Sequence, residues 1–300
     1  MSKMRQTVLI ACSNFRKWHK NPQIILCFLL VFIFCFLLSD KMLQFAQAHG
    51  TYLQGMEAFI WTFGDSQSVL AISILLLLLF SGIPDLSNEV PYMIVRTDRR
   101  VWMLGQILYL IAATFCFMLF ILVATVFLSA DRAYAANLWS DTAAILGYSG
   151  LGETLAVPAF VKVLELTDPY HCSLHLFLLM TGYTVTMAGV ILFWNLCRKN
   201  GGMVGGVIYS AFGLLMNPDI VAKWFGISME RMRIANILSG WISPLNHATY
   251  YMHSFGYDNL PKLWQSYLFF LVASVLLFAA SLHQIKNYPF QFTGTSVLSR

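Results

Sequence analysis

The stretch that decides the fold is ILYLIAATFCFMLFILVATVFL, residues 107–128, which carries no charged side chain. A helix of this length rises about 33 Å, slightly more than the hydrocarbon core of a bilayer, about 30 Å. The rest of the chain has a similar character, because 58% of its 300 residues are hydrophobic and only 11% are charged. Such a chain is too apolar to be disordered, and a soluble domain could not bury this much apolar surface. We therefore predict an all-α, polytopic membrane protein.

Five other apolar runs complete a set of six predicted transmembrane helices. The predicted spans are residues 24–43, 68–83, 107–128, 174–196, 203–216 and 267–282. We assign residues 1–22 to a separate amphipathic helix and residues 23–300 to a single transmembrane domain. The long segments 129–173 and 217–266 are predicted to lie on the outer side. The sequence leaves open whether residues 155–166, or helical hairpins within 217–266, enter the bilayer.

Basic residues give the predicted orientation. Twelve of the 19 Lys and Arg residues fall in the four short segments 1–22, 84–101, 197–202 and 283–300, although the alternating segments are longer. Lys and Arg are enriched in cytoplasmic loops, so both termini are predicted to be cytoplasmic. The same short clusters between apolar runs are typical of membrane topology and not of nucleic-acid binding.

The first 20 residues are predicted to form an amphipathic helix on the inner membrane surface. The expected apolar face is made of residues three to four apart: Val8, Cys12, Phe15 and His19. Arg16 and Lys17 point mainly in other directions, and Asn21-Pro22 ends the helix. The alternative is a basic tail that only fixes topology.

The predicted inner segment between the second and third spans carries the densest group of charges. Asp85 and Glu89 are four residues apart and would share one helix face. A compact charged element beneath the membrane is suited to docking a cytoplasmic partner, and the alternative is a solvated loop that only fixes topology. The mixed cluster that precedes the third span consists of Arg96, Asp98, Arg99 and Arg100.

Small and hydroxyl-bearing residues mark two further spans. Two overlapping small-xxx-small pairs open the fifth span, and they are predicted to allow close helix packing or, alternatively, to form a hinge. The residues of these pairs are Gly201, Gly202, Gly205 and Gly206. In the fourth span, Thr181, Tyr183 and Thr184 are candidates for lining a pathway, although hydrogen bonds to neighbouring helices are the more frequent use of such residues.

The sequence contains no recognisable catalytic or nucleotide-binding motif. GxxxxGK[ST], HExxH and GxSxG are all absent, and the cores of the spans lack the ionisable residues that ion-coupled carriers use. His247 and His253 are six residues apart with no Cys, Asp or Glu between them, so we predict no metal site. They are, however, the basis of an alternative hypothesis, an intramembrane enzyme.

Taken in order, these features resemble the membrane-spanning subunit, or permease, of a type-2 ATP-binding cassette (ABC) transporter. Residues 5–20 followed by Asn21-Pro22 resemble the family's elbow helix, and residues 85–105 resemble its connection between the second and third spans. Ile242-Ser-Pro244 resembles its outer hairpin region. The long segment 129–173 and the weak fifth span depart from the family pattern, and they leave the substrate and the direction of transport open.

The resemblance implies that this chain has no catalytic residues and no cofactor of its own. A separate ABC ATPase subunit would bind ATP and Mg and would contact the elbow helix and the inner connection. A second copy of this permease, or a homologous one, would complete the pathway, and most members of the family export their substrates. We expect a multi-pass protein of the bacterial cell (plasma) membrane, surrounded by lipid. The main alternative is a non-transporting accessory or immunity-type membrane protein.

Overall fold

The computed structural model of the chain describes residues 2–84, 90–154, 157, 159–198, 201–256 and 258–288. It is 81% helical, which confirms the all-α prediction. Four helices are long and apolar enough to cross a membrane: α2 (Pro22–His49), α6 (Arg99–Ser129), α10 (Pro169–Cys197) and α15 (Leu263–Gln284). Several long apolar helices of this kind are the architecture of a multi-pass membrane protein.

Two bent helix pairs raise the number of candidate spans to as many as six. The helix α3 (Glu57–Phe63) meets α4 (Ser66–Phe80) at 86°, and α11 (Gly202–Leu215) meets α12 (Pro218–Phe225) at 79°. Taken alone, α4 and α11 rise only about 21–23 Å, less than the hydrocarbon thickness. Each is therefore a short span or one half of a broken one.

Shorter elements occupy the two ends of the bundle. The remaining α-helices are α1 (Lys3–Arg16), α5 (Val90–Arg96), α7 (Asp141–Tyr148), α8 (Leu151–Thr154), α9 (Val161–Leu166), α13 (Met232–Ile242) and α14 (Pro244–Ala248). The 3₁₀ turns are η1 (Trp18–Lys20), η2 (Ala130–Arg132), η3 (Met229–Arg231), η4 (Tyr250–Met252) and η5 (Ile285–Asn287). Strands β1 (Leu53–Gln54) and β2 (Ala133–Tyr134) form a two-residue parallel pair, with Leu53 opposite Ala133.

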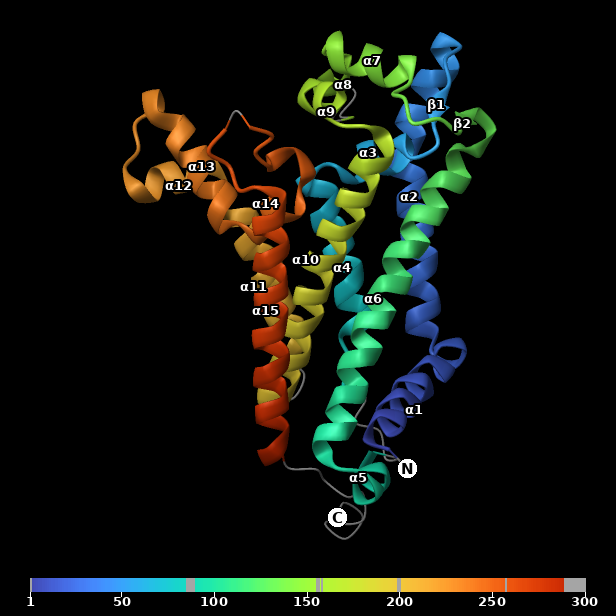
Figure 1. The fold of residues 1–300 in the computed structure, drawn as a ribbon, viewed down its shortest axis with the longest axis vertical. Coiled ribbons are helices and arrows are strands. Elements are labelled where there is room, and N and C mark those ends of the chain that lie inside the picture. Colours follow the sequence, from blue (N-terminus) through green and yellow to red (C-terminus); the bar gives the residue numbers. More distant parts are fainter. Residues whose placement is uncertain are drawn as a thin grey trace, which may run out of the picture.

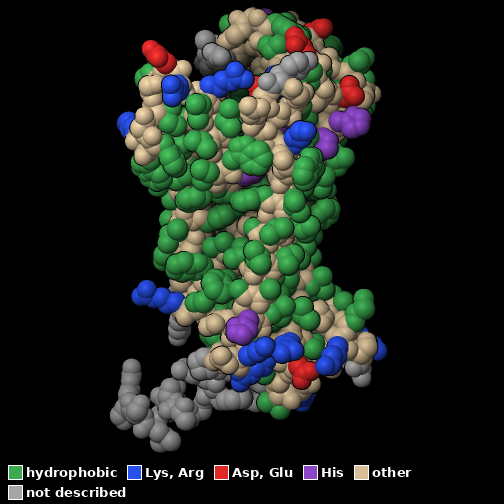
Figure 2. Space-filling model, turned by 60° about the vertical axis from the view of Figure 1, so that its left-hand side comes forward, with side chains coloured by type: hydrophobic (Ala, Val, Ile, Leu, Met, Phe, Trp, Pro, Cys, Tyr) green, Lys and Arg blue, Asp and Glu red, His purple; other side chains and the backbone are tan. Residues whose placement is uncertain are grey.

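The long helices run side by side along the molecule, and short elements gather at both ends (Figure 1). One end, here called the basic end, carries α1, α5 and the end of α15. The opposite, distal end carries α7 to α9 and, beside them, the α12–α13 pair. Figure 2 shows a broad apolar band between the two polar ends, with blue Lys and Arg side chains clustered at the basic end. Such a band is the surface expected of a bundle surrounded by lipid.

The central helix of the bundle is α10, which contacts α3, α4, α6, α11, α14 and α15. Its side chains are buried on nearly every side, among them Leu179, Tyr183 and Met187, which are fully enclosed. A helix that is apolar all round can occupy such a position, because none of its faces needs water. The other long helices expose apolar side chains outward, for example Leu29 of α2 and Leu271 of α15.

Each predicted span falls on a helix, but most of these helices continue past the apolar run. The largest difference is at α6, which begins at Arg99 instead of residue 107, because backbone hydrogen bonding continues into the polar end. The second predicted span ends earlier than expected, since α4 stops at Phe80. In the segment 155–166, the described helix is α9, and residues 155, 156 and 158 lie outside the described residues.

The segment 217–266 contains the hairpin that the sequence suggested. Asn217 caps α12 by accepting a hydrogen bond from the backbone amide of Asp219, and the left-handed Gly226 ends the helix. The helices α12 and α13 then pack together around Val221, Ala222 and other buried residues.

Candidate functional site

The amphipathic N-terminal helix is present, and one side of it packs against the bundle. Ile10 and Ala11 are buried there, whereas Val8 and Cys12 of the predicted membrane-facing side are exposed. The helix α1 therefore has two apolar sides, one of which packs against α6 while the other is left open. Figure 1 shows α1 lying beside the lower part of α6.

The backbones of α1 and α6 approach closely at Gly105. A Cβ atom placed on this glycine would lie 2.6 Å from Cγ2 of Ile10 and 3.1 Å from the backbone oxygen of Thr7. Only a residue without a side chain lets Ile10 lie directly over the helix at this point. Gly105 therefore sets the distance between the N-terminal helix and the long helix beneath it.

Two side-chain hydrogen bonds connect α1 and η1 to α6 further along. Asn14 donates from Nδ2 to Oε1 of Gln106 at 3.0 Å, and Trp18 donates from Nε1 to the hydroxyl of Tyr109 at 2.8 Å. The ring of Phe15 packs against both aromatic partners, with centroids 4.9 Å from Trp18 and 5.0 Å from Tyr109. Hydrogen bonds with defined geometry fix the angle as well as the distance between the elements.

The start of α6 contacts two other parts of the chain. Lys3 of α1 forms an ion pair with Asp98 at 3.3 Å, and both side chains are exposed, so the pair contributes little to stability. Arg99 donates from Nη1 to the backbone oxygens of Lys286 at 2.8 Å and Tyr288 at 3.1 Å. The beginning of α6 therefore contacts both the start of α1 and the segment that follows α15.

The structure separates the predicted docking residues into two groups. Arg96 ends α5, and Asp98, Arg99 and Arg100 follow it at the start of α6, all of them exposed. Arg16 and Lys17 lie at the other end of α1, about 20 Å along that helix from Lys3. Asp85 and Glu89 lie outside the described residues.

The predicted packing glycines lie where α11 meets its neighbours. A Cβ atom on Gly202 would meet the side-chain amide of Asn195, one on Gly205 would meet the ring of Trp194, and one on Gly206 would meet Leu77 and Ile191. Gly201 immediately precedes α11 and is close to the backbone oxygens of Trp194 and Arg198. All four positions have neighbours that leave little room for a side chain.

Asn195 is a connecting residue that the sequence did not reveal. Its Nδ2 donates to the backbone oxygens of Ile83 at 2.6 Å and Ser81 at 3.2 Å, and its Oδ1 accepts from the backbone amide of Gly202 at 2.7 Å. One side chain thus ties α10 to the segment after α4 and to the start of α11. No sequence motif marks this asparagine, near the end of an apolar run, as a residue that connects helices.

The candidate pathway residues of α10 make mainly packing contacts. The hydroxyls of Thr181 and Thr184 donate to backbone oxygens one turn earlier in their own helix. Tyr183 is fully buried, and its hydroxyl accepts a 3.2 Å hydrogen bond from Ser73 of α4. These contacts match the packing alternative, and a role in a transport pathway stays a prediction.

His247 and His253, which are far from a good helical spacing, meet at one serine. Nδ1 of His247 and Nε2 of His253 each lie 2.7 Å from Oγ of Ser266, at the start of α15. The other ring nitrogens face backbone oxygens, that of Trp241 for His247 and that of Tyr250 for His253, both at 3.0 Å. All three side chains are buried, so no substrate reaches the serine hydroxyl in this conformation.

The cluster of two imidazoles and one hydroxyl is one proton short of a complete hydrogen-bond network. Its four contacts need four hydrogens, whereas two neutral imidazoles and one hydroxyl supply three. Burial nevertheless disfavours an added charge and lowers the pKa of His253 to about 4, and burial likewise lowers the pKa of His247. The arrangement supports a structural role, in which neutral imidazoles hold α14 and η4 against α15.

Among the described residues, no three His, Cys, Asp or Glu side chains come close enough together to hold a metal ion. Comparison with known proteins adds no assignment, since no protein family, curated protein or solved structure matches this chain. The case for function therefore rests on the geometry of the basic end.

Proposed function

We propose that this chain is the permease subunit of an ABC transporter, driven by a separate ATPase subunit at the basic end. The observation that carries the proposal is the attachment of α1 to α6 through Gly105, the Asn14–Gln106 contact and the Trp18–Tyr109 contact. Because α1 would lie at the membrane surface and is attached to the long span α6, a force applied to the exposed side of α1 would be transmitted to that span.

The proposed topology has six spans, with α4 and α11 as the short second and fifth. The basic end lies in the cytoplasm, which the distribution of cations supports. Its described Lys and Arg residues are Lys3, Arg5, Arg16, Lys17, Lys20, Arg96, Arg99, Arg100, Arg198 and Lys286. The distal helices α7 to α9, α12 and α13 then lie on the outer side.

In the proposed mechanism, ATP closes the two partner ATPase domains, and their movement reaches the permease at α5 and the start of α6. Arg96 and Asp98 are exposed there, Asp98 in its surface ion pair with Lys3. The bonds from Arg99 to the backbone after α15 carry the same displacement to the last span. Two permeases, arranged about a two-fold axis, would then open the pathway outward, and export is the proposed direction.

The topology is testable with the chain's own cysteines. Cys12 and Cys197 are exposed at the basic end, and Ser149 is exposed at the distal end. A membrane-impermeant maleimide applied to intact cells should label a Ser149→Cys variant but leave Cys12 and Cys197 unlabelled until the cells are opened. Labelling of Cys12 in intact cells would contradict the proposed orientation.

The partner is testable by affinity purification of the tagged chain from its native membranes in mild detergent. We expect an ATP-hydrolysing subunit to copurify, and charge reversal by the pair Arg96→Glu and Asp98→Lys should reduce its recovery. The matched control is Arg231→Glu, an exposed cation at the distal end. Recovery of a partner without ATPase activity would favour the accessory or immunity-type alternative. If Arg231→Glu reduced the recovery of the ATP-hydrolysing subunit equally, Arg96 and Asp98 would have no specific role in docking.

A further inference from the structure

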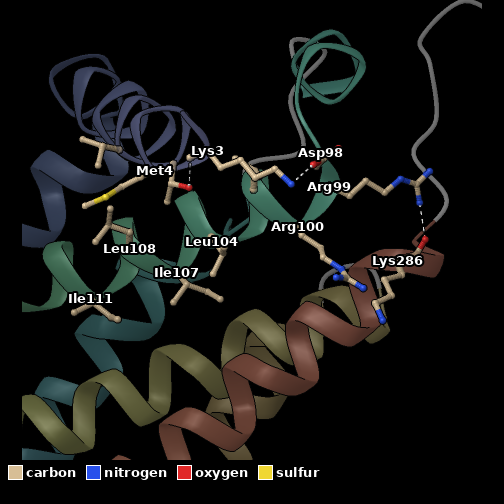
Figure 3. A pocket seen from close by; sticks show the side chains of 13 residues that line it. Lys3, Met4, Asp98, Arg99, Arg100, Leu104, Ile107, Leu108, Ile111 and Lys286 are labelled. Carbon is tan, nitrogen blue, oxygen red and sulfur yellow. Dashed lines mark hydrogen bonds and ion pairs between the residues drawn. The ribbon is translucent and has the colours of Figure 1, made fainter. Parts of the chain in front are cut away.

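A groove of about 970 Å³ opens at the basic end between α1, the first turns of α6 and η5 (Figure 3). Its mouth is charged and its floor is apolar. The mouth is formed by Lys3, Asp98, Arg99, Arg100 and Lys286. The floor is formed by Met4, Val8, Leu104, Ile107, Leu108 and Ile111.

The apolar floor follows one side of α6 into the membrane region. Leu104, Leu108 and Ile111 are four and three residues apart, so they share one face of the helix. Their exposed fractions are 43%, 38% and 42%, so the rest of the described chain does not cover this face of α6. Val8 of α1 borders the same surface and is also exposed. This floor is suited to an apolar chain lying along the helix.

The mouth of the groove has an excess of positive charge. Four cations and one carboxylate line it, and Asp98 is already paired with Lys3. The side chains of Arg100 and Lys286 extend toward one another from two different elements (Figure 3). Neither forms an ion pair with any residue in the described part of the chain. Two cations that face each other favour an anion between them.

The start of α6 adds to this preference for an anion. Asp98 precedes the helix, but its side chain makes no capping hydrogen bond to the first turn and is directed to Lys3 instead. This end of α6 therefore carries the partial positive charge of a helix N-terminus. A phosphate near Arg100 would be attracted by this helix end as well as by the two cationic side chains.

We propose that this groove binds an anionic phospholipid from the leaflet at the basic end. The phosphate lies between Arg100 and Lys286, and one acyl chain follows Leu104, Leu108 and Ile111. From Arg100 to Ile111 the helix rises about 16 Å, which is comparable with the length of an acyl chain. A second copy of this chain is a poor occupant, because its own basic mouth would repel this one.

The proposal does not rest on the proposed function, since it uses only the position of the groove beside an apolar span and the charge at its mouth. A soluble anion would satisfy the mouth but leave the floor uncovered. A neutral lipid would cover the floor but leave the two cations unpaired. An anionic lipid does both.

The test is native mass spectrometry of the purified chain incubated with equal amounts of phosphatidylglycerol and phosphatidylcholine. We expect the wild-type chain to retain phosphatidylglycerol preferentially. The double variant Arg100→Gln, Lys286→Gln should reduce this preference by roughly 25-fold, taking about fivefold for each basic side chain near an anionic headgroup. The melting temperature of the variant in phosphatidylcholine should equal that of the wild type, which shows that the fold is kept.

The matched control is Arg198→Gln, an exposed cation at the same end but outside the groove. This control should keep the preference for phosphatidylglycerol, and an equal loss would show general surface attraction and overturn the proposal. Inorganic phosphate and glycerophosphoglycerol, which lack acyl chains, should not displace the lipid at equal concentration. Displacement by either would show an anion site without a role for the floor, and would also overturn it.

Discussion

The indole of Trp18 donates a 2.8 Å hydrogen bond to the hydroxyl of Tyr109, and this bond joins η1, just after the N-terminal helix, to the longest helix of the bundle. The two rings also lie edge to face, with centroids 6.5 Å apart. Both side chains combine a large apolar body with one polar atom, which suits the boundary between lipid and water. The hydrogen bond therefore fixes the orientation of the turn η1, which connects α1 to α2, relative to α6.

Removing this hydrogen bond should loosen α1 without unfolding the bundle. We expect Tyr109→Phe to lower the free energy of local opening of α1 by about 1 kcal/mol, the usual contribution of one hydrogen bond. The measurement is amide hydrogen exchange of residues 3–20 in detergent. Trp18→Phe should lower this free energy more, because it also removes part of the ring that packs against Phe15, and the loss in the double variant should be clearly less than the sum of the two single losses. Strict additivity would show that the two side chains do not act as a pair.

Gly105 should tolerate even a methyl group poorly. Gly105→Ala places a Cβ atom 2.6 Å from Cγ2 of Ile10, so α1 must shift or rotate away from α6. We expect faster hydrogen exchange in α1 and a lower melting temperature, with a cost of about 1–3 kcal/mol. The matched control is Gly82→Ala, because a Cβ atom there would meet no atom within 4 Å. If both variants behave alike, the close approach at Gly105 is not a constraint on the fold.

Asn195→Leu should destabilise the junction of α4, α10 and α11. The substitution keeps the approximate volume but leaves the backbone oxygen of Ile83 and the amide of Gly202 without their partner. We expect a loss of about 2 kcal/mol, measured as a fall in melting temperature of the purified protein. Asn137→Leu is the control, because Asn137 is exposed and its side-chain oxygen accepts a 3.2 Å hydrogen bond from the amide of Tyr170. A similar loss in the control would contradict a special role for Asn195.

The sequence was a good guide to the helices and a poor guide to the contacts between them. Apolar runs such as 107–128 predict spans because lipid demands apolar side chains along the whole crossing. The side of α1 that packs against α6 could not be predicted, because periodicity separates apolar from polar positions but does not say which apolar side meets protein. Asn195 and Ser266 escaped notice because their partners stand at no characteristic spacing, and some of them, such as Ile83 for Asn195, lie far away in the sequence.

At the candidate site, too, the sequence predicts which residues are involved but not the contacts that they make. The cluster of Arg96, Asp98, Arg99 and Arg100 stands out in the sequence as charge between two spans, and the structure places these residues together at the basic end. Its link to Lys286 could not be predicted, because Arg99 binds backbone oxygens there, and any residue type supplies a backbone oxygen. The groove beside Arg100 likewise exists only because α1 and η5 meet α6 from different directions.

The buried pair His247 and His253 should make stability depend on pH in a defined direction. Burial, together with smaller contributions from the nearby His247 and Lys162, lowers the pKa of His253 to about 4, against about 6.5 in an unfolded chain. Between these values the unfolded chain binds a proton that the folded chain does not. The free energy of unfolding should therefore be highest above pH 6.5 and should fall as the pH is lowered toward 4, by up to about 1.4 kcal/mol per pH unit.

This dependence should be traceable to the histidine cluster by substitution. In His253→Gln, the side chain cannot titrate, so the fall in melting temperature between pH 7.5 and pH 5 should be smaller than in the wild type. His19→Gln is the matched control, because His19 is an exposed histidine of η1 at the other end of the molecule, so this variant should keep the pH-dependent fall of the wild type. A wild-type chain that grows more stable as the pH falls would contradict the prediction. It would mean that a proton gained by the Ser266 cluster, by completing the fourth hydrogen bond, outweighs the cost of a buried charge.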